Sequence, residues 1–172
     1  MKLYYPKLWF TFLIVGVFAC SEVEKKPPYV IPENAGLLVA GDSGKTWKLA
    51  RRFNDGTRMN MGDCFLAYRQ TYQPDMTVRD NNGDNYDCGE SLEGKWTFAQ
   101  DEAGNYYIKI SSEQLPELMN IEEEYKYFKV LHLADDELVL QFAHRQFSNK
   151  KTRITDILVP ENSSVEGRDF HW

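Results

Sequence analysis

Residues 125–142 read YKYFKVLHLADDELVLQF and decide the fold class of this chain. Two β-rich runs flank Ala134-Asp135-Asp136, a pattern that predicts a β-hairpin. Apolar and polar residues alternate with a period of two in further segments, at 47–49, 65–72, 95–98, 106–110 and 152–159. Pro74-Asp75, Asn82-Gly83 and Ala103-Gly104 are typical turn sequences between them. About eight short strands therefore predict an all-β, antiparallel meander that closes into a small barrel or a sandwich.

Residues 111–124 depart from this alternation and fit either a short helical turn or a loop. No segment between the strands has a helical pattern of the length that a crossover connection requires. A parallel βαβ fold is therefore not expected.

The first residues have the order of a secretory signal peptide. Lys2 and Lys7 precede an apolar run at 8–19, and the small residue Ala19 stands before Cys20. The run has about 12 residues, whereas a transmembrane helix needs about 20. Ala19-Cys20 resembles the lipobox of bacterial lipoproteins, in which the cysteine becomes the lipidated N-terminus, for example with palmitate. The alternative is an ordinary secretory signal followed by a chance cysteine.

The chain divides into a signal peptide (residues 1–19), a proline-containing tether (20–40), a barrel domain (41–160) and a polar C-terminal tail (161–172). Removal of the leader takes away two lysines, so the formal charge of −6 becomes −8. A surface this acidic argues against nucleic acid as a partner. We expect a location in the cell envelope, periplasmic or surface-exposed, with a lipid anchor in the membrane.

Cys64 and Cys88 are the two cysteines that remain once Cys20 is lipidated. Export removes them from the reducing cytoplasm, so we expect them to form a disulfide around one hairpin. Such a bridge would stabilise the domain by roughly 3 kcal/mol. A metal site or a pair of free thiols are the alternatives, and no histidine or further cysteine stands at ligand spacing.

Several short motifs follow one another between residues 41 and 160. They are the first strand with Trp47, Asp63-Cys64, Pro74-Asp75-Met76-Thr77, Asp87-Cys88, Gly94-Lys95-Trp96 and the late hairpin through residues 138–140. In this order they resemble the lipocalin-like lipoprotein domains of bacterial cell envelopes. The resemblance implies an eight-stranded, up-and-down barrel tethered by lipid, with no established chemistry for most members. Met76 stands where the family has glycine, which predicts a different turn geometry.

An eight-stranded barrel either fills itself with side chains or holds one small ligand. Aromatic residues make up 14% of the chain, and an apolar pocket would use them together with a few polar groups. The pocket candidates are Trp47, Leu66, Tyr68, Trp96, Phe98 and Phe142. The alternation fits equally a barrel whose core these residues fill. The corresponding functions are binding of a small apolar ligand, or a structural or protein-interaction role with an envelope partner.

Three further motifs resemble known catalytic or binding sites but lack a required residue or structural context. Residues 37–46 resemble a phosphate-binding loop, but Val39 stands where glycine is required and no helix pattern follows. Gly41-Asp42-Ser43 resembles the nucleophile block of small esterases, but His171, its late partner, lies in the tail. Residues 80–87 alternate oxygen ligands as calcium loops do, with Asn85 at the position of the essential glycine. We therefore expect no enzyme, with a small hydrolase as the weakest alternative, and no metal or cofactor.

Overall fold

A computed structural model gives the structure of residue 1, residues 27–145 and residues 150–171. Residues 2–19 of the predicted signal peptide and Cys20, the predicted lipid-attachment residue, lie outside these described residues. Within them, no helix has both the length and the apolar character needed to cross a membrane.

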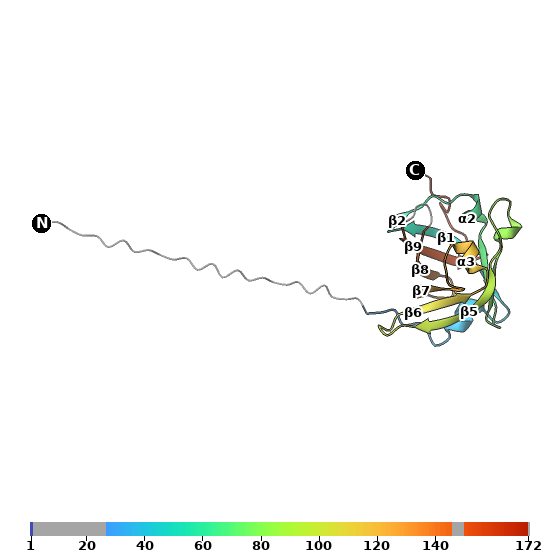
Figure 1. Cartoon of the computed structure of the whole chain (residues 1–172), viewed down its shortest axis with the longest axis horizontal. Coiled ribbons are helices and arrows are strands. Elements are labelled where there is room, and N and C mark those ends of the chain that lie inside the picture. The colour runs from blue at the N-terminus through green and yellow to red at the C-terminus, as the bar shows by residue number, and fades with distance from the viewer. Residues whose placement is uncertain (2–26, 146–149, 172) are drawn as a thin grey trace.

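The sheet is a closed barrel of eight antiparallel strands that follow one another around it in chain order. The strands are β1 (Lys45–Asn54), β3 (Arg69–Tyr72), β4 (Thr77–Asp80), β5 (Glu93–Gln100), β6 (Tyr106–Ser111), β7 (Tyr125–Leu133), β8 (Leu138–His144) and β9 (Thr152–Pro160). β9 pairs with β1 and closes the ring, so that β1, β9, β8, β7 and β6 lie one below another in Figure 1. The predicted all-β, up-and-down, lipocalin-like barrel is confirmed.

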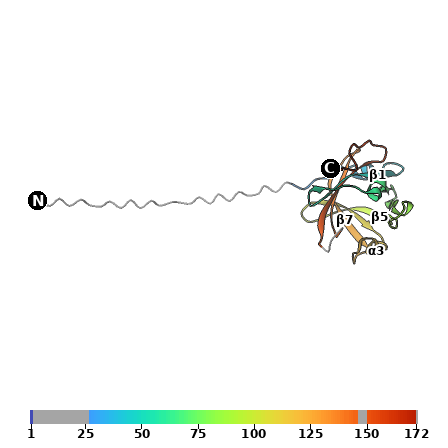
Figure 2. The same ribbon diagram turned by 90° about the horizontal axis from the view of Figure 1, so that it is seen from above.

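Short elements occupy the two ends of the barrel. They are α1 (Ala35–Ala40), the two-residue strand β2 (Thr57–Arg58), α2 (Asp63–Ala67), the 3-10 helix η1 (Asn82–Asp84) and α3 (Leu115–Met119). α2, η1 and α3 lie in the connections at the end of the barrel that we call the open end, and β2 pairs with the last residues of β1 there. The opposite, closed end carries the three hairpin turns at 73–76, 101–105 and 134–137. Figure 2, seen from above, shows α3 on the side of the ring away from β1.

Residues 27–40, which fall within the predicted tether, pack against the closed end of the barrel. α1 buries Ala35, Val39 and Ala40, and the indole N–H of Trp47 donates a hydrogen bond to the Val39 carbonyl (2.8 Å). Tyr29 lies earlier, and its hydroxyl contacts the backbone N–H and carbonyl of Leu133 at 3.1 Å each. α1 is too short to be stable as an isolated helix. Burial of its apolar side chains against the barrel stabilises it.

Alternate strand residues fill the closed half of the barrel. Trp47, Tyr72 and Trp96 are fully buried there, and the rings of Tyr72 and Trp96 make an edge-to-face contact at 5.6 Å. The Trp96 indole N–H donates to the Gln73 carbonyl (3.1 Å), which satisfies its buried donor. This half of the barrel is therefore solid core.

The segment 65–72 differs from the predicted strand. Residues up to Ala67 belong to α2, and only Arg69–Tyr72 is extended. Tyr68 N donates to the Cys64 carbonyl (2.9 Å), which ends the helix and turns the chain into β3. Alternation alone cannot separate one helical turn from a strand of similar length.

A β-bulge in β1 changes which side chains face the interior. The pairing of β1 with β9 shifts between Leu49 and Arg51, so Ala50 is an extra residue. Before the bulge Trp47 and Leu49 point inward, whereas after it Arg51 is exposed and Arg52 points inward. The bulge thus places a guanidinium inside the barrel.

The C-terminal tail, predicted from its polar composition, is fixed along β1. β1 pairs with β3 only as far as Lys48, which leaves the Leu49 carbonyl without a strand partner. Arg168 Nε donates to that carbonyl (2.6 Å), and the Asp169 carbonyl accepts from Met61 N (3.1 Å). The tail therefore covers the gap that opens where β1 and β3 diverge.

Candidate ligand cavity

A cavity of about 300 Å³ lies inside the open half of the barrel. α2 and the 81–92 loop form one side of its rim, and α3 forms another. The apolar lining side chains come from α2, α3, the 81–92 loop and the inner faces of β7, β8 and β9, and they are Phe65, Leu92, Leu115, Leu118, Met119, Phe128, Leu140, Phe142 and Leu158. Small-molecule sites have volumes of roughly 300–1,000 Å³ and mostly apolar walls, so this cavity matches the lower end of that range.

Arg52 and Asp156 form an ion pair in the wall of the cavity. Arg52 Nε and Nη2 each donate to one carboxylate oxygen of Asp156 at 2.6 Å. The pairing raises the pKa of Arg52 against the opposing effect of its burial, so it stays charged. The guanidinium also stacks on Phe65, with Cζ 4.6 Å from the ring centroid. Among the described residues its remaining N–H groups have no hydrogen-bond partner.

Tyr68, Gln70 and Asp80 are the polar lining residues contributed by the neighbouring strands β3 and β4 and the residue before β3, and Tyr72 lies behind Gln70 in the core. The Tyr72 hydroxyl donates to Gln70 Oε1 (3.0 Å), and burial raises the Tyr72 pKa. Burial also raises the pKa of Tyr68 well above its usual value. Asp80 Oδ1 accepts from the backbone N–H groups of Asn82 and Leu92 at 3.1 Å each, yet burial outweighs these bonds and raises the Asp80 pKa.

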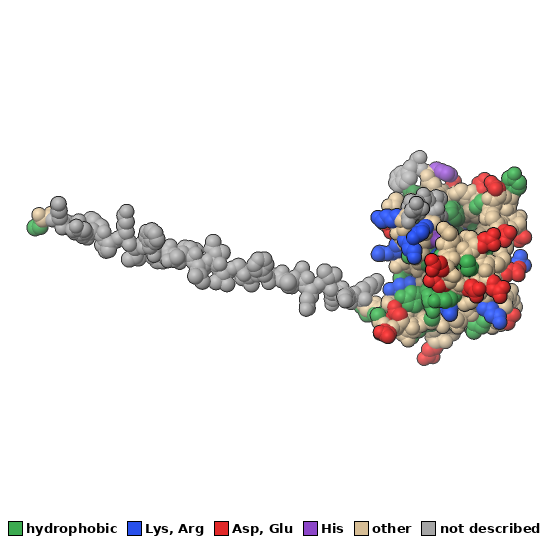
Figure 3. All heavy atoms as spheres, viewed as in Figure 1, with side chains coloured by type: hydrophobic (Ala, Val, Ile, Leu, Met, Phe, Trp, Pro, Cys, Tyr) green, Lys and Arg blue, Asp and Glu red, His purple; other side chains and the backbone are tan. Residues whose placement is uncertain are grey.

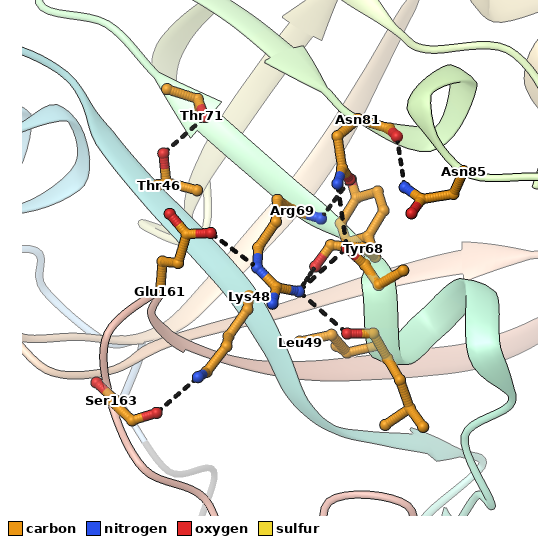
Figure 4. A network of polar contacts seen from close by, with 12 residues as sticks. Thr46, Lys48, Leu49, Tyr68, Arg69, Thr71, Asn81, Asn85, Glu161 and Ser163 are labelled. Carbon is orange, nitrogen blue, oxygen red and sulfur yellow. Dashed lines mark hydrogen bonds and ion pairs between the residues drawn. The ribbon is translucent and has the colours of Figure 1, made fainter.

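The rim beside α2 is fixed by covalent and polar contacts. The predicted disulfide between Cys64 and Cys88 is confirmed, and it joins α2 to the 81–92 loop where both line the cavity. Arg69 Nη1 donates to the carbonyls of residues 66, 67 and 68 at 2.9–3.1 Å, and its Nε contacts Glu161 (3.2 Å) in the C-terminal tail. Figure 4 shows this guanidinium at the centre of the network. The rim is therefore fixed by contacts with the barrel and with the C-terminal tail.

Lys126 and His144 lie inside the open end beside Phe142. Lys126 is only 9% exposed, between the outward-facing Tyr125 and Tyr127. Its Nζ lies 5.2 Å from the Phe142 ring centroid, and burial, with a contribution from Lys151, lowers its pKa to about 8. Burial, Lys126 and Arg52 lower the pKa of His144 to about 4, so its imidazole is neutral at pH 7.

The structure divides the six predicted pocket residues. Tyr68 and Phe142 line the cavity. Trp47 and Trp96 belong to the solid core of the closed half, and Leu66 and Phe98 pack partly buried against that core without lining the cavity. The closed half thus corresponds to the filled-core interpretation and the open half to the pocket interpretation.

The charged residues of the site and the lining residues of α3 were not predicted from the sequence. Arg52 depends on the bulge at Ala50, which has no sequence signature here. Leu115 and Leu118 lie in the segment that fitted either a turn or a loop. Lys126 and Asp156 lie on the inner faces of β7 and β9, among buried apolar residues. This placement of a charged residue on an otherwise apolar strand face was the sequence signal that could have identified them.

No protein-family model matches the sequence, and no curated protein is significantly similar to it. The fold, a lipocalin-like closed barrel of eight antiparallel strands, therefore defines the class of this protein at the level of architecture. Within the described residues no group of three or more His, Cys, Asp or Glu side chains is placed to hold a metal ion.

Proposed function

We propose that this protein is an envelope lipoprotein whose barrel binds a small apolar ligand in the open-end cavity. The observation that carries the proposal is the enclosed apolar wall formed by α3 and β8, in a barrel whose other half is packed solid. Bound apolar surface contributes about 25 cal/mol for each Å² removed from water. A ligand that fills the cavity would gain this contribution without any rearrangement of the core.

Binding rather than catalysis is the proposed activity. Polar groups that line the cavity have hydrogen-bond partners within the barrel: Arg52 pairs with Asp156, and Gln70 accepts from the hydroxyl of the buried core residue Tyr72. Groups held in this way orient a ligand or fix the wall. The proposed partners are therefore a small apolar molecule and, through Cys20, the membrane.

Displacement of a fluorescent apolar probe tests the binding proposal. N-phenyl-1-naphthylamine should bind the purified protein with increased emission, and Leu118→Trp should weaken binding at least tenfold by filling the cavity. Leu37→Trp is the matched control, because Leu37 is about half exposed on α1 at the closed end. Absence of binding, or equal binding by the Leu118→Trp variant, would refute the proposal.

Replacement of Cys20 tests the membrane attachment separately. The wild-type chain should incorporate labelled palmitate and enter the detergent phase on phase separation, and Cys20→Ser should abolish both. Cys64→Ser with Cys88→Ser is the control for cysteine loss in general. Unchanged partitioning of the Cys20→Ser protein would count against the anchor.

A further inference from the structure

The charges around the cavity are distributed unequally. Asp80 and Glu90, which line it, belong to β4 and the loop that follows β4. Lys126, His144 and Arg52 come from β7, β8 and β1. In the ring of eight strands β4 and β8 are four strands apart in either direction, so they face each other across the barrel. Asp80 and Glu90 thus form an acidic side of the cavity. The cationic side, across the barrel, consists of Lys126 and His144, which lie beside Phe142 and do not themselves line the cavity. The ion pair of Arg52 and Asp156 lies between the two sides, on β1 and β9.

The cationic side carries uncompensated positive charge. Asp156 neutralises Arg52. Among the described residues no carboxylate lies within ion-pair distance of Lys126, whose contact is the ring of Phe142. Lys151 and Arg52, the other charged groups acting on Lys126 and His144, are also cations. Burial of an unpaired ammonium is costly, and it is found where a bound group supplies the missing negative charge.

Phe142 connects this charge to the cavity. Its ring lines the cavity, and Lys126 Nζ and Arg52 Cζ lie 5.2 Å and 6.0 Å from its centroid. Arg52 has N–H donors that the Asp156 carboxylate does not use. A molecule whose chain lies along Leu118, Leu140 and Phe142 would therefore bring one end to the two cations.

We propose that the ligand is an amphiphile with a single anionic head group, and that Lys126 and Arg52 hold this head beside Phe142 while the apolar body fills the cavity. This inference rests on the proposed function and specifies its ligand class. The orientation follows from the charges, because the acidic side at Asp80 and Glu90 repels the head. On the outer face shown in Figure 3, Lys and Arg side chains gather mainly on the left and acidic ones mainly to the right.

Competition between two chains of equal length and different heads tests the inference. Decanoate should displace N-phenyl-1-naphthylamine at least tenfold better than 1-decanol, since a hydrogen bond to a charged group contributes more than one to a neutral group. Lys126→Met should reduce this ratio, because decanoate then loses one of its two cationic partners and 1-decanol loses no charge interaction. Lys126→Arg, which keeps the charge, should restore the preference for decanoate.

Lys129→Met is the matched control, because Lys129 lies on the same strand and faces outward. It should retain the wild-type ratio. Equal affinity for decanoate and 1-decanol in the wild type, or an unchanged ratio in Lys126→Met, would overturn the inference and leave the proposed function standing. Failure of every apolar compound to bind would overturn both.

Discussion

The stability of the protein should increase when Lys126 is replaced by methionine. Lys126 is buried without a carboxylate partner, and its pKa falls from 10.5 to about 8. At about 1.36 kcal/mol for each pKa unit this difference corresponds to roughly 3.4 kcal/mol of cost at neutral pH. The lysine lies at the open end, where solvent screens part of the charge, so we expect a gain of about 2 kcal/mol.

The stability difference between the wild type and Lys126→Met should depend on pH in a specific direction. Between pH 8 and 10.5 the unfolded wild-type chain binds more protons at Lys126 than the folded protein does, so wild-type stability rises with pH in that window. The advantage of Lys126→Met should therefore be complete below pH 8 and shrink toward pH 10.5. The charged groups facing Lys126 do not reverse this, because Arg52 stays protonated there, His144 is already neutral and Lys151 is exposed.

Urea unfolding of the purified wild-type and variant proteins at pH 7 and at pH 10.5 measures this effect. Lys129→Met should change stability by less than about 0.5 kcal/mol at both pH values, as expected for a surface substitution. A Lys126→Met protein that is less stable than the wild type at pH 7, or whose advantage is the same at both pH values, would refute the reasoning.

Three further stability predictions use the same assay. Asp156→Asn should destabilise the protein by about 3 kcal/mol, because it leaves Arg52 buried and unpaired. The double change Arg52→Met with Asp156→Leu should cost much less, and equal losses of stability in the two variants would contradict this prediction. Cys64→Ala with Cys88→Ala should lower stability by about 3 kcal/mol, since the bridge closes a loop with a sequence separation of 24 residues, and reducing agent should then have no additional effect. Met76→Gly should stabilise the β3–β4 turn by about 0.5–1 kcal/mol, because Met76 has φ 66° and is about half exposed; a loss of stability would show that its side chain contributes more than the backbone strain costs.

Strand periodicity predicted the barrel because most strands have one buried face. The hairpin of β7 and β8 follows its sequence pattern, and the turn at 134–137 lies where Asp135-Asp136 predicted it. Tertiary packing decided the cases that periodicity could not. Burial of Val39 makes a short helix of a segment that reads as a tether, and the turn of α2 at Cys64 makes a helix of a segment that alternates like a strand.

The cavity was harder to predict than the barrel. Aromatic residues are equally suited to core and pocket, so the sequence could not separate Trp96, which packs in the closed half, from Phe142, which lines the cavity. Whether an aromatic residue packs in the core or lines the cavity depends on its position along the barrel axis. That position depends in turn on where each strand begins and ends. Arg52 faces inward only because a single bulged residue shifts the alternation of β1.

The placement of residues 27–40 at one pole of the barrel determines how an anchored protein would be oriented. The described chain enters at the pole that α1 seals, and in Figure 1 α2 and the C-terminal end of the chain lie toward the other. An acyl group on Cys20 would hold the sealed pole toward the bilayer and turn the mouth toward the aqueous compartment. If the proposed ligand binding and lipid anchor are both correct, the ligand would enter from solution or from a facing membrane, and not from the leaflet that holds the anchor.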